Sequence, residues 1–159
     1  MSMQTAIDYM REHQKRSYPS STLSIFRFLF GGMMVFSIIR FATNGWIRKF
    51  YIDPTFHFRY FGFEFVRPLG EWTYLIFIVC GFSALAVCLG WRYHVAIVSF
   101  FLSFTYIELM DKTTYLNHYY FVSVVSFLLI FVPAASQFSI DAIQKKKNFQ
   151  YLSDGIQIA

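Results

Sequence analysis

Four long apolar windows, separated by polar or aromatic segments, dominate the chain. They cover residues 23–41, 72–89, 94–109 and 117–133. Each is close to the roughly 17–25 residues that a helix needs to cross the hydrocarbon core of a bilayer, although the third window is short on its own. Only helices and closed barrels satisfy their backbone groups in lipid, and these runs are too long and continuous for barrel strands. The pattern therefore predicts an all-α integral membrane protein with four transmembrane helices.

The windows divide the chain into three parts. Residues 1–22 form a polar N-terminal tail, residues 23–133 a four-helix membrane domain, and residues 134–159 a polar C-terminal segment. The tail contains no apolar stretch like that of a secretory signal, so we expect no cleavable signal peptide.

Composition supports the membrane class. Hydrophobic residues make up 56% of the chain and charged residues only 14%, whereas a soluble domain carries about 25% charged residues. The net charge of +5 is spread over tails and loops, so we expect no nucleic-acid partner. Four spans would place both tails and the turn at Arg92 on one side, with seven Lys and Arg residues against five on the other. The positive-inside rule then predicts cytoplasmic tails.

The connection between the first two windows is unusually aromatic. Residues 44–72 contain ten aromatic side chains in 29 residues, and such rings are expected to be buried in the bilayer interface or against the helices. The alternation in residues 56–60 and 61–65 favours short extended pieces. Two interpretations stay open: an interfacial aromatic belt, or a wall over a pocket for a flat lipophilic ligand.

Several residues inside the windows have simple structural interpretations. Arg27 and Arg40 lie near opposite ends of the first window, so we expect their long side chains to reach the two interfaces. Gly31 and Gly32 permit close helix approach or a local bend. Cys80 and Cys88 would lie about 12 Å apart along one helix, too far for a disulfide, and are expected to be small buried side chains.

The junction between the last two windows carries the candidate chemistry, because ionisable groups at membrane depth are costly and mark function. A lysine acts as a base only when neutral, and burial under the aromatic connection would penalise the ammonium form of Lys112. If the third helix continued, however, Glu108 would lie one turn back and favour the charged form by pairing. Lys112 is thus either a buried base or an interfacial anchor.

The other polar residues of this junction also have two interpretations. Asn117 is either a helix N-cap or part of a site, and His118 is either a proton relay or an interfacial histidine. His57, in the aromatic connection, is predicted on the same membrane face. We find no metal-ligand spacing, no nucleophile elbow, no phosphate loop and no dinucleotide fingerprint.

Residues 89–120 resemble the vitamin K-dependent gamma-carboxylase family, which includes the bacterial horizontally transferred transmembrane (HTTM) domain proteins. The resemblance extends over roughly residues 20–142, including the stretches "RFATNGWI" and "FHFRYFGFEFVRPL" upstream and "SIDA" at 139–142. The residues that carry the signature are Gly90, Arg92, Tyr93, Asp111, Lys112, Thr113, Asn117, His118 and Tyr119.

The resemblance implies a carboxy-lyase and quinol epoxidase type of activity. Lys112 would be the general base that deprotonates reduced vitamin K or a menaquinol-type quinol, with O2 and CO2 as co-substrates, no metal, and glutamate gamma-carboxylation of a peptide as the outcome. His118 would supply a supporting hydrogen bond or relay. The residues implied in substrate binding are Asp111, Thr113, Asn117, Tyr119, His57 and Tyr60.

The resemblance also implies further membrane helices, so we expect residues 23–133 to be an incomplete domain of a longer protein, inactive on its own if essential parts are missing. The bacterial branch favours a bacterial cytoplasmic membrane, or the endoplasmic reticulum in a eukaryote. The alternative function is a non-catalytic multi-pass domain that packs with a partner or binds lipid or quinone.

Overall fold

Each of the four apolar windows folds as an α-helix in the computed structural model, which describes residues 20–114, 116–144 and 146. The helices are α2 (Ser20–Thr43), α3 (Thr73–Leu89), α4 (Tyr93–Leu109) and α5 (Asn117–Ile130). Their ends lie within three residues of the predicted windows, and the described residues contain no strand. The all-α prediction is confirmed.

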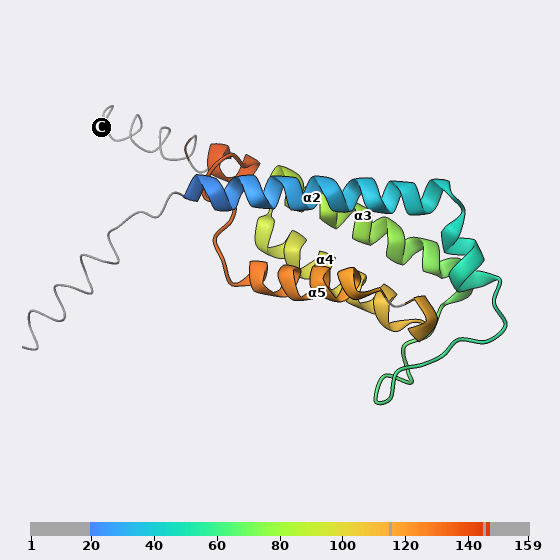
Figure 1. The fold of residues 1–159 in the computed structure, drawn as a ribbon. Helices are drawn as coiled ribbons and strands as arrows, with labels where there is room; N and C mark the ends of the chain where they lie inside the picture. The colour runs from blue at the N-terminus through green and yellow to red at the C-terminus, as the bar shows by residue number, and fades with distance from the viewer. Residues whose placement is uncertain (1–19, 115, 145, 147–159) are drawn as a thin grey trace, which may run out of the picture.

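Shorter helical turns connect these helices. A π-helical turn at Arg48–Ile52 follows α2, a 3-10 turn at Gly70–Trp72 leads into α3, and a 3-10 turn at Lys112–Thr114 separates α4 from α5. Residues 140–144 are also helical. Between the first two turns, residues 53–69 contain no helix or strand and form a loop at one end of the bundle (Figure 1). The short extended pieces favoured by the alternation are not paired as strands in these described residues.

The helices pack in chain order, α2 on α3, α3 on α4 and α4 on α5. Gly31 allows the first contact, since a Cβ atom at this position would lie 2.6 Å from the backbone nitrogen of Cys88. The predicted close approach at this glycine pair is therefore confirmed at Gly31. Phe30 of α2 also meets Phe100 of α4 edge to face, with ring centroids 5.8 Å apart, so the bundle has one shared core.

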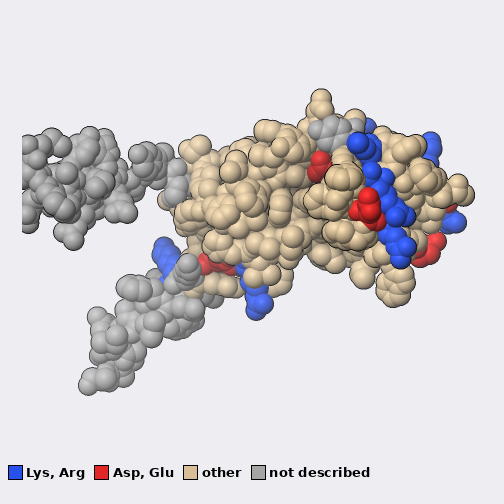
Figure 2. All heavy atoms as spheres, turned by 90° about the horizontal axis from the view of Figure 1, so that it is seen from below, with Lys and Arg blue, Asp and Glu red and all other residues tan. Residues whose placement is uncertain are grey.

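The outer surface of the bundle is apolar. Phe36, Phe82 and Leu102 are 68%, 69% and 61% exposed, and on the face shown in Figure 2 the charged side chains gather toward the two ends of the bundle. An exposed apolar surface of this kind is typical of contact with lipid. Two helical stretches, Ser21–Thr43 and Gly70–Leu89, are long and apolar enough to span a membrane.

The other two apolar helices are shorter. At 1.5 Å per residue, the 17 residues of α4 and the 14 residues of α5 reach about 25 Å and about 21 Å, below the roughly 30 Å of a typical hydrocarbon core. The structure therefore supports two of the four predicted spans by length and shows the other two as apolar helices packed beside them.

Arg27 corrects one prediction. Its side chain does not extend to an interface but is fully buried, and it donates hydrogen bonds to the carbonyls of Val87, Cys88, Ala134 and Phe138 at 2.6–3.1 Å. The segment after α5 returns to the N-terminal end of α2, as Figure 1 shows, and brings the last two carbonyls within reach. Arg40, in contrast, is exposed beside the ring of Trp46.

The two cysteines behave as predicted. Cys80 and Cys88 are both buried and both free.

Candidate functional site

The predicted junction between α4 and α5 lies against the aromatic loop. The backbone N–H of Lys112 donates to the carbonyl of Phe58 at 2.8 Å, and Nδ1 of His57 lies 2.9 Å from Oδ2 of Asp111. The loop and the turn after α4 are thus joined by two adjacent contacts. The prediction that His57 and Asp111 share one end of the bundle is confirmed by this pair.

Asp111 shapes the turn itself. Its Oδ1 accepts hydrogen bonds from the backbone N–H and the hydroxyl of Thr113, both at 2.8 Å, an arrangement in which an Asp side chain replaces a backbone acceptor and bends the chain two residues later. Asp111 is only 4% exposed. Burial alone would raise its pKa, but the hydrogen bonds from Thr113 and His57 outweigh burial and lower the pKa below its ordinary value.

The lowered pKa of Asp111 gives a pH-dependent prediction. A group with a lowered folded-state pKa stabilises the fold fully above its ordinary pKa, about 3.9 for Asp, and this stabilisation is lost as the pH falls through the folded-state pKa. We expect the Lys112 amide to stay protected from hydrogen exchange at neutral pH and to lose protection at acidic pH, after correction for intrinsic rates. Exchange measured by NMR in detergent micelles checks this.

The substitution Asp111→Asn should remove that pH dependence and weaken the contact. A hydrogen bond to a charged group is worth about 1.5–3 kcal/mol, so exchange at Lys112 should become roughly 10- to 100-fold faster. Asp53→Asn is the matched control, because Asp53 is exposed and pairs with Arg48 at 3.3 Å. Equal protection in wild type and Asp111→Asn would contradict the prediction.

Lys112 is exposed, so the structure does not show the buried base and is compatible with the other interpretation, an interfacial anchor. Its Nζ lies 5.6 Å from the ring centroid of Tyr60, a distance at which an ammonium group is attracted to the ring face. The possible pairing with Glu108 is also not formed, because α4 ends at Leu109 and Glu108 accepts a hydrogen bond from Ser123 at 2.6 Å. Lys112 and Tyr60, two of the candidate site residues, therefore lie in contact.

A cavity of about 720 Å³ opens in the aromatic loop beside this contact. Several of the loop rings are largely exposed, among them Phe61 at 98% and Phe65 at 75%, so these rings are not buried against the helices, and burial in the bilayer interface is the predicted alternative that they leave open. The lining consists of residues 55–61 with Glu64, Arg67 and Pro68. The cavity therefore combines aromatic faces with His57, Tyr60 and charged groups.

The residues at the start of α5 do not line this cavity. Asn117 and His118 are exposed, and the N-cap position is Leu116, so the predicted Asn117 cap is wrong by one residue. The His118 ring stacks edge to face on Tyr119, with centroids 4.6 Å apart. Tyr119 is half-buried and turns inward to Phe104. The structure thus does not bring these residues into the His57 cluster.

A second, smaller cavity of about 40 Å³ lies between the helices. Glu108 and Tyr119 line it together with Ser37, Tyr51 and apolar side chains from α2, α3 and α4. The sequence analysis predicts Glu108 only as a partner of Lys112 and does not predict its place in this cavity. The sequence contains a signal for this position, because an acidic residue inside an apolar, membrane-length window usually has a functional role.

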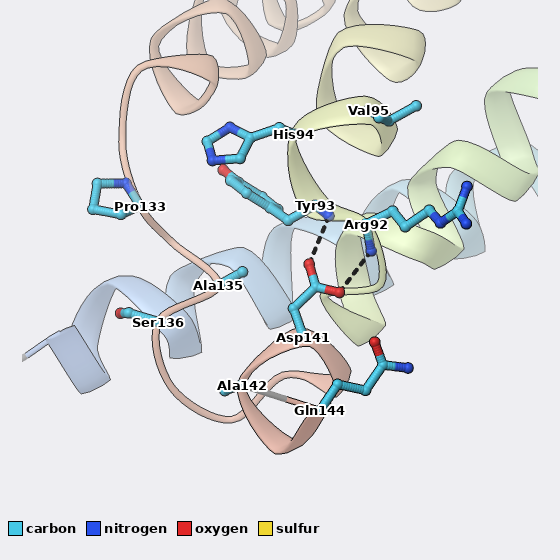
Figure 3. Close-up of a pocket in the computed structure, with 10 residues that line it drawn as sticks. All are labelled: Arg92, Tyr93, His94, Val95, Pro133, Ala135, Ser136, Asp141, Ala142 and Gln144. Atoms are coloured by element: carbon cyan, nitrogen blue, oxygen red, sulfur yellow. Dashed lines mark hydrogen bonds between the residues drawn. The ribbon is translucent and has the colours of Figure 1, made fainter. Parts of the chain in front are cut away.

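The opposite end of the bundle holds a third cavity, of about 690 Å³ (Figure 3). Asp141 dominates it, accepting hydrogen bonds from the backbone N–H groups of Arg92 and Tyr93, both at 2.9 Å. These are orphan donors at the start of α4, so Asp141 caps that helix from a distant segment. Asp141, the acidic residue of the "SIDA" stretch, therefore has a structural role, since it holds the turn between α3 and α4.

Among the described residues, no three His, Cys, Asp or Glu side chains lie close enough to hold a metal ion.

Comparison with known proteins gives one family. The family model described as HTTM domain matches residues 15–152, which cover most of the chain. No solved structure matches the chain.

Proposed function

The chain belongs to the HTTM domain family, and from this membership we propose that it acts in a membrane-embedded, gamma-carboxylase-like enzyme that uses a quinol. HTTM domains occur in gamma-carboxylase-like membrane proteins. The proposed ligand is reduced vitamin K or a menaquinol-type quinol, with O2 and CO2 as co-substrates and a glutamate-containing peptide as acceptor.

One observation carries the proposal: the Lys112 amine lies over Tyr60 beside the loop cavity. Ligand pockets usually measure about 300–1,000 Å³ and combine apolar walls with a few polar groups, and the loop cavity, at about 720 Å³, has this size and chemistry. A flat quinol ring can stack on the aromatic side chains of the loop, while its hydroxyl groups meet the polar ones. The residues present therefore fit the proposed ligand.

In the proposed reaction, Lys112 in its neutral form takes the proton of a quinol hydroxyl. When bound, the quinol would supply oxygenation chemistry, in which quinol and O2 give epoxide and water. In the coupled reaction, CO2 would replace a proton on the gamma carbon of glutamate. Asp111 and Thr113 hold the turn that carries Lys112. Roles for Asn117, His118 and Tyr119 remain predictions from the resemblance.

A second function has a specific observation in its favour. Because Lys112 is exposed, its amine is not withdrawn from water, as a general base of this type would need. Lys112 and the exposed loop rings suit an interfacial anchor equally well, which corresponds to a non-catalytic domain that packs with a partner or binds lipid or quinone. The enzymatic proposal therefore requires that the bound ligand covers Lys112 and removes its amine from water.

We expect Lys112→Ala to reduce epoxide formation from reduced vitamin K by at least about 100-fold, the lower range of a general base contribution. The assay uses membranes that contain the full-length protein and measures epoxide and CO2 incorporation. Lys49→Ala is the matched control, because Lys49 is also exposed and its Nζ lies 5.9 Å from the ring of Phe50.

Activity that is equal in wild type and Lys112→Ala, or absent from both, would favour the non-catalytic function. The proposed location is a bacterial cytoplasmic membrane, or the endoplasmic reticulum of a eukaryote, with both tails in the cytoplasm. Labelling of Lys112 from outside intact cells tests this orientation.

A further inference from the structure

His57 is held in the wall of the loop cavity by a buried carboxylate. Its side chain is 15% exposed, and its Nδ1 lies 2.9 Å from Oδ2 of Asp111, whose side chain is 5% exposed. The second oxygen of Asp111 accepts two hydrogen bonds from Thr113. Because an ionised carboxylate can only accept hydrogen bonds, the proton between the two side chains belongs to Nδ1. The carboxylate therefore fixes both the ring orientation and the tautomer.

The other ring nitrogen is consequently a proton acceptor. In the neutral imidazole that carries its proton on Nδ1, Nε2 presents a lone pair. No described residue forms a hydrogen bond with Nε2, and no described side chain buries an unpaired nitrogen or oxygen. Since His57 lines the cavity of about 720 Å³, Nε2 is available to a molecule bound there.

We propose that His57 is a second catalytic residue of the loop cavity, with Nε2 accepting a phenolic proton from a bound quinol and Asp111 acting as its positioning residue. The inference rests on the proposed function and deepens it. The O–H bond of the quinol breaks, an N–H bond forms at Nε2, and the electron pair stays on the phenolate oxygen. The positive charge on the ring is then stabilised by the adjacent carboxylate.

Imidazole suits this step because it exchanges protons near neutral pH, and a histidine oriented by a buried acid is a common form of general base. A quinol has two hydroxyl groups, so Lys112 and His57 can serve different oxygens of one ligand. The backbone contact between Lys112 and Phe58 keeps the two side chains on adjoining segments.

A purely structural role for His57 makes a different prediction. The loop is already tied to the turn by the bond from Lys112 to Phe58, and the His57–Asp111 contact would simply strengthen that tie. His57→Asn separates the two roles, because the Asn amide can donate to Asp111 from about the position of Nδ1 but has no basic atom in place of Nε2. His94→Asn is the matched control, since His94 is exposed at the opposite end of the bundle.

The experiment measures turnover of menadiol, a reduced naphthoquinone, by the full-length protein in membranes. We expect His57→Asn to lower kcat by about 100-fold or more with KM changed less than about threefold, and His94→Asn to match wild type. Added imidazole should restore part of kcat in His57→Ala, which a structural tie would not explain. Wild-type kcat in His57→Asn overturns the proposal.

A second measurement does not depend on turnover. With ¹⁵N-labelled histidine, anaerobic menadiol should shift the Nε2 resonance of His57, assigned by its loss in His57→Asn, and leave His94 unchanged. If wild type binds menadiol with this shift but shows no oxygenation, the proposed enzymatic function fails while the acceptor role of His57 is supported. Absence of the shift at saturating menadiol overturns the acceptor role.

Discussion

Replacing Arg27 with methionine is expected to lower the free energy of unfolding by at least about 3 kcal/mol. The guanidinium is fully buried and donates to four backbone carbonyls, two at the end of α3 and two in the segment after α5. Methionine fills a similar volume but donates nothing, so four acceptors lose charge-assisted bonds. Leaving one buried acceptor without its donor usually costs about 1–3 kcal/mol, and here several carbonyls are affected together.

The loss should appear in detergent micelles as a lower thermal midpoint and a lower SDS concentration for unfolding. Arg40→Met is the matched control, since Arg40 lies on the same helix but is exposed beside Trp46, and exposed charges contribute about 1 kcal/mol or less. Arg27→Lys should be intermediate, because a single ammonium cannot reach four carbonyls at once. A variant Arg27→Met as stable as Arg40→Met would show that the guanidinium does not connect these segments.

Length and hydropathy were enough to predict the helices, because each apolar window is long and bounded by polar residues. They were not enough for Arg27. Its position near a helix end fits an arginine that reaches the interface, and the partners that bury it, Ala134 and Phe138, lie more than 100 residues away. A local pattern carries no information about a segment that returns from the far end of the chain.

The inward face of α5 shows a second reason why the hydropathy pattern does not predict the packing. Tyr119, Val122, Ser123 and Ser126 follow helical spacing and turn inward, whereas Phe121 and Phe127 are exposed. The face of α5 that turns toward the bundle is therefore less apolar than its outer face. Lipid surrounds the outer face instead of water, and small polar residues are suited to contacts between helices. Reading the most apolar face as the core would give the opposite orientation and would miss that Tyr119 is half-buried against Phe104.

At the candidate site, sequence predicted which residues share one end of the bundle but not how they are directed. His57 was expected on the same membrane face as Asp111, and the structure joins the two by a hydrogen bond that the sequence did not predict. For Lys112, the next residue, the sequence left a buried base and an interfacial anchor open, and the structure shows an exposed side chain. The turn that Asp111 makes with Thr113 explains the difference, because it ends the helical path of α4 and sends adjacent side chains in different directions.

The close contact between α2 and α3 gives the second large prediction. A Cβ atom on Gly31 would lie 2.6 Å from the nitrogen and 2.7 Å from the Cα atom of Cys88. These are backbone atoms, so the clash cannot be relieved by a side-chain rotation, and the two helices must separate. Overpacking of this kind costs about 1–3 kcal/mol, and we expect Gly31→Ala to lie at the upper end of that range despite the better helix propensity of alanine.

Gly32→Ala is the matched control, one residue along the same helix. Its Cβ atom would meet only the Sγ atom of Cys88, at an ordinary contact distance of 3.9 Å, so the substitution should be neutral or stabilise the helix by up to about 1 kcal/mol. The two variants make the same chemical change, Gly to Ala, and differ only in the direction in which the added methyl group points. Opposite signs in SDS-induced unfolding would therefore report the helix contact itself, and equal effects would mean that α2 and α3 do not approach closely at Gly31.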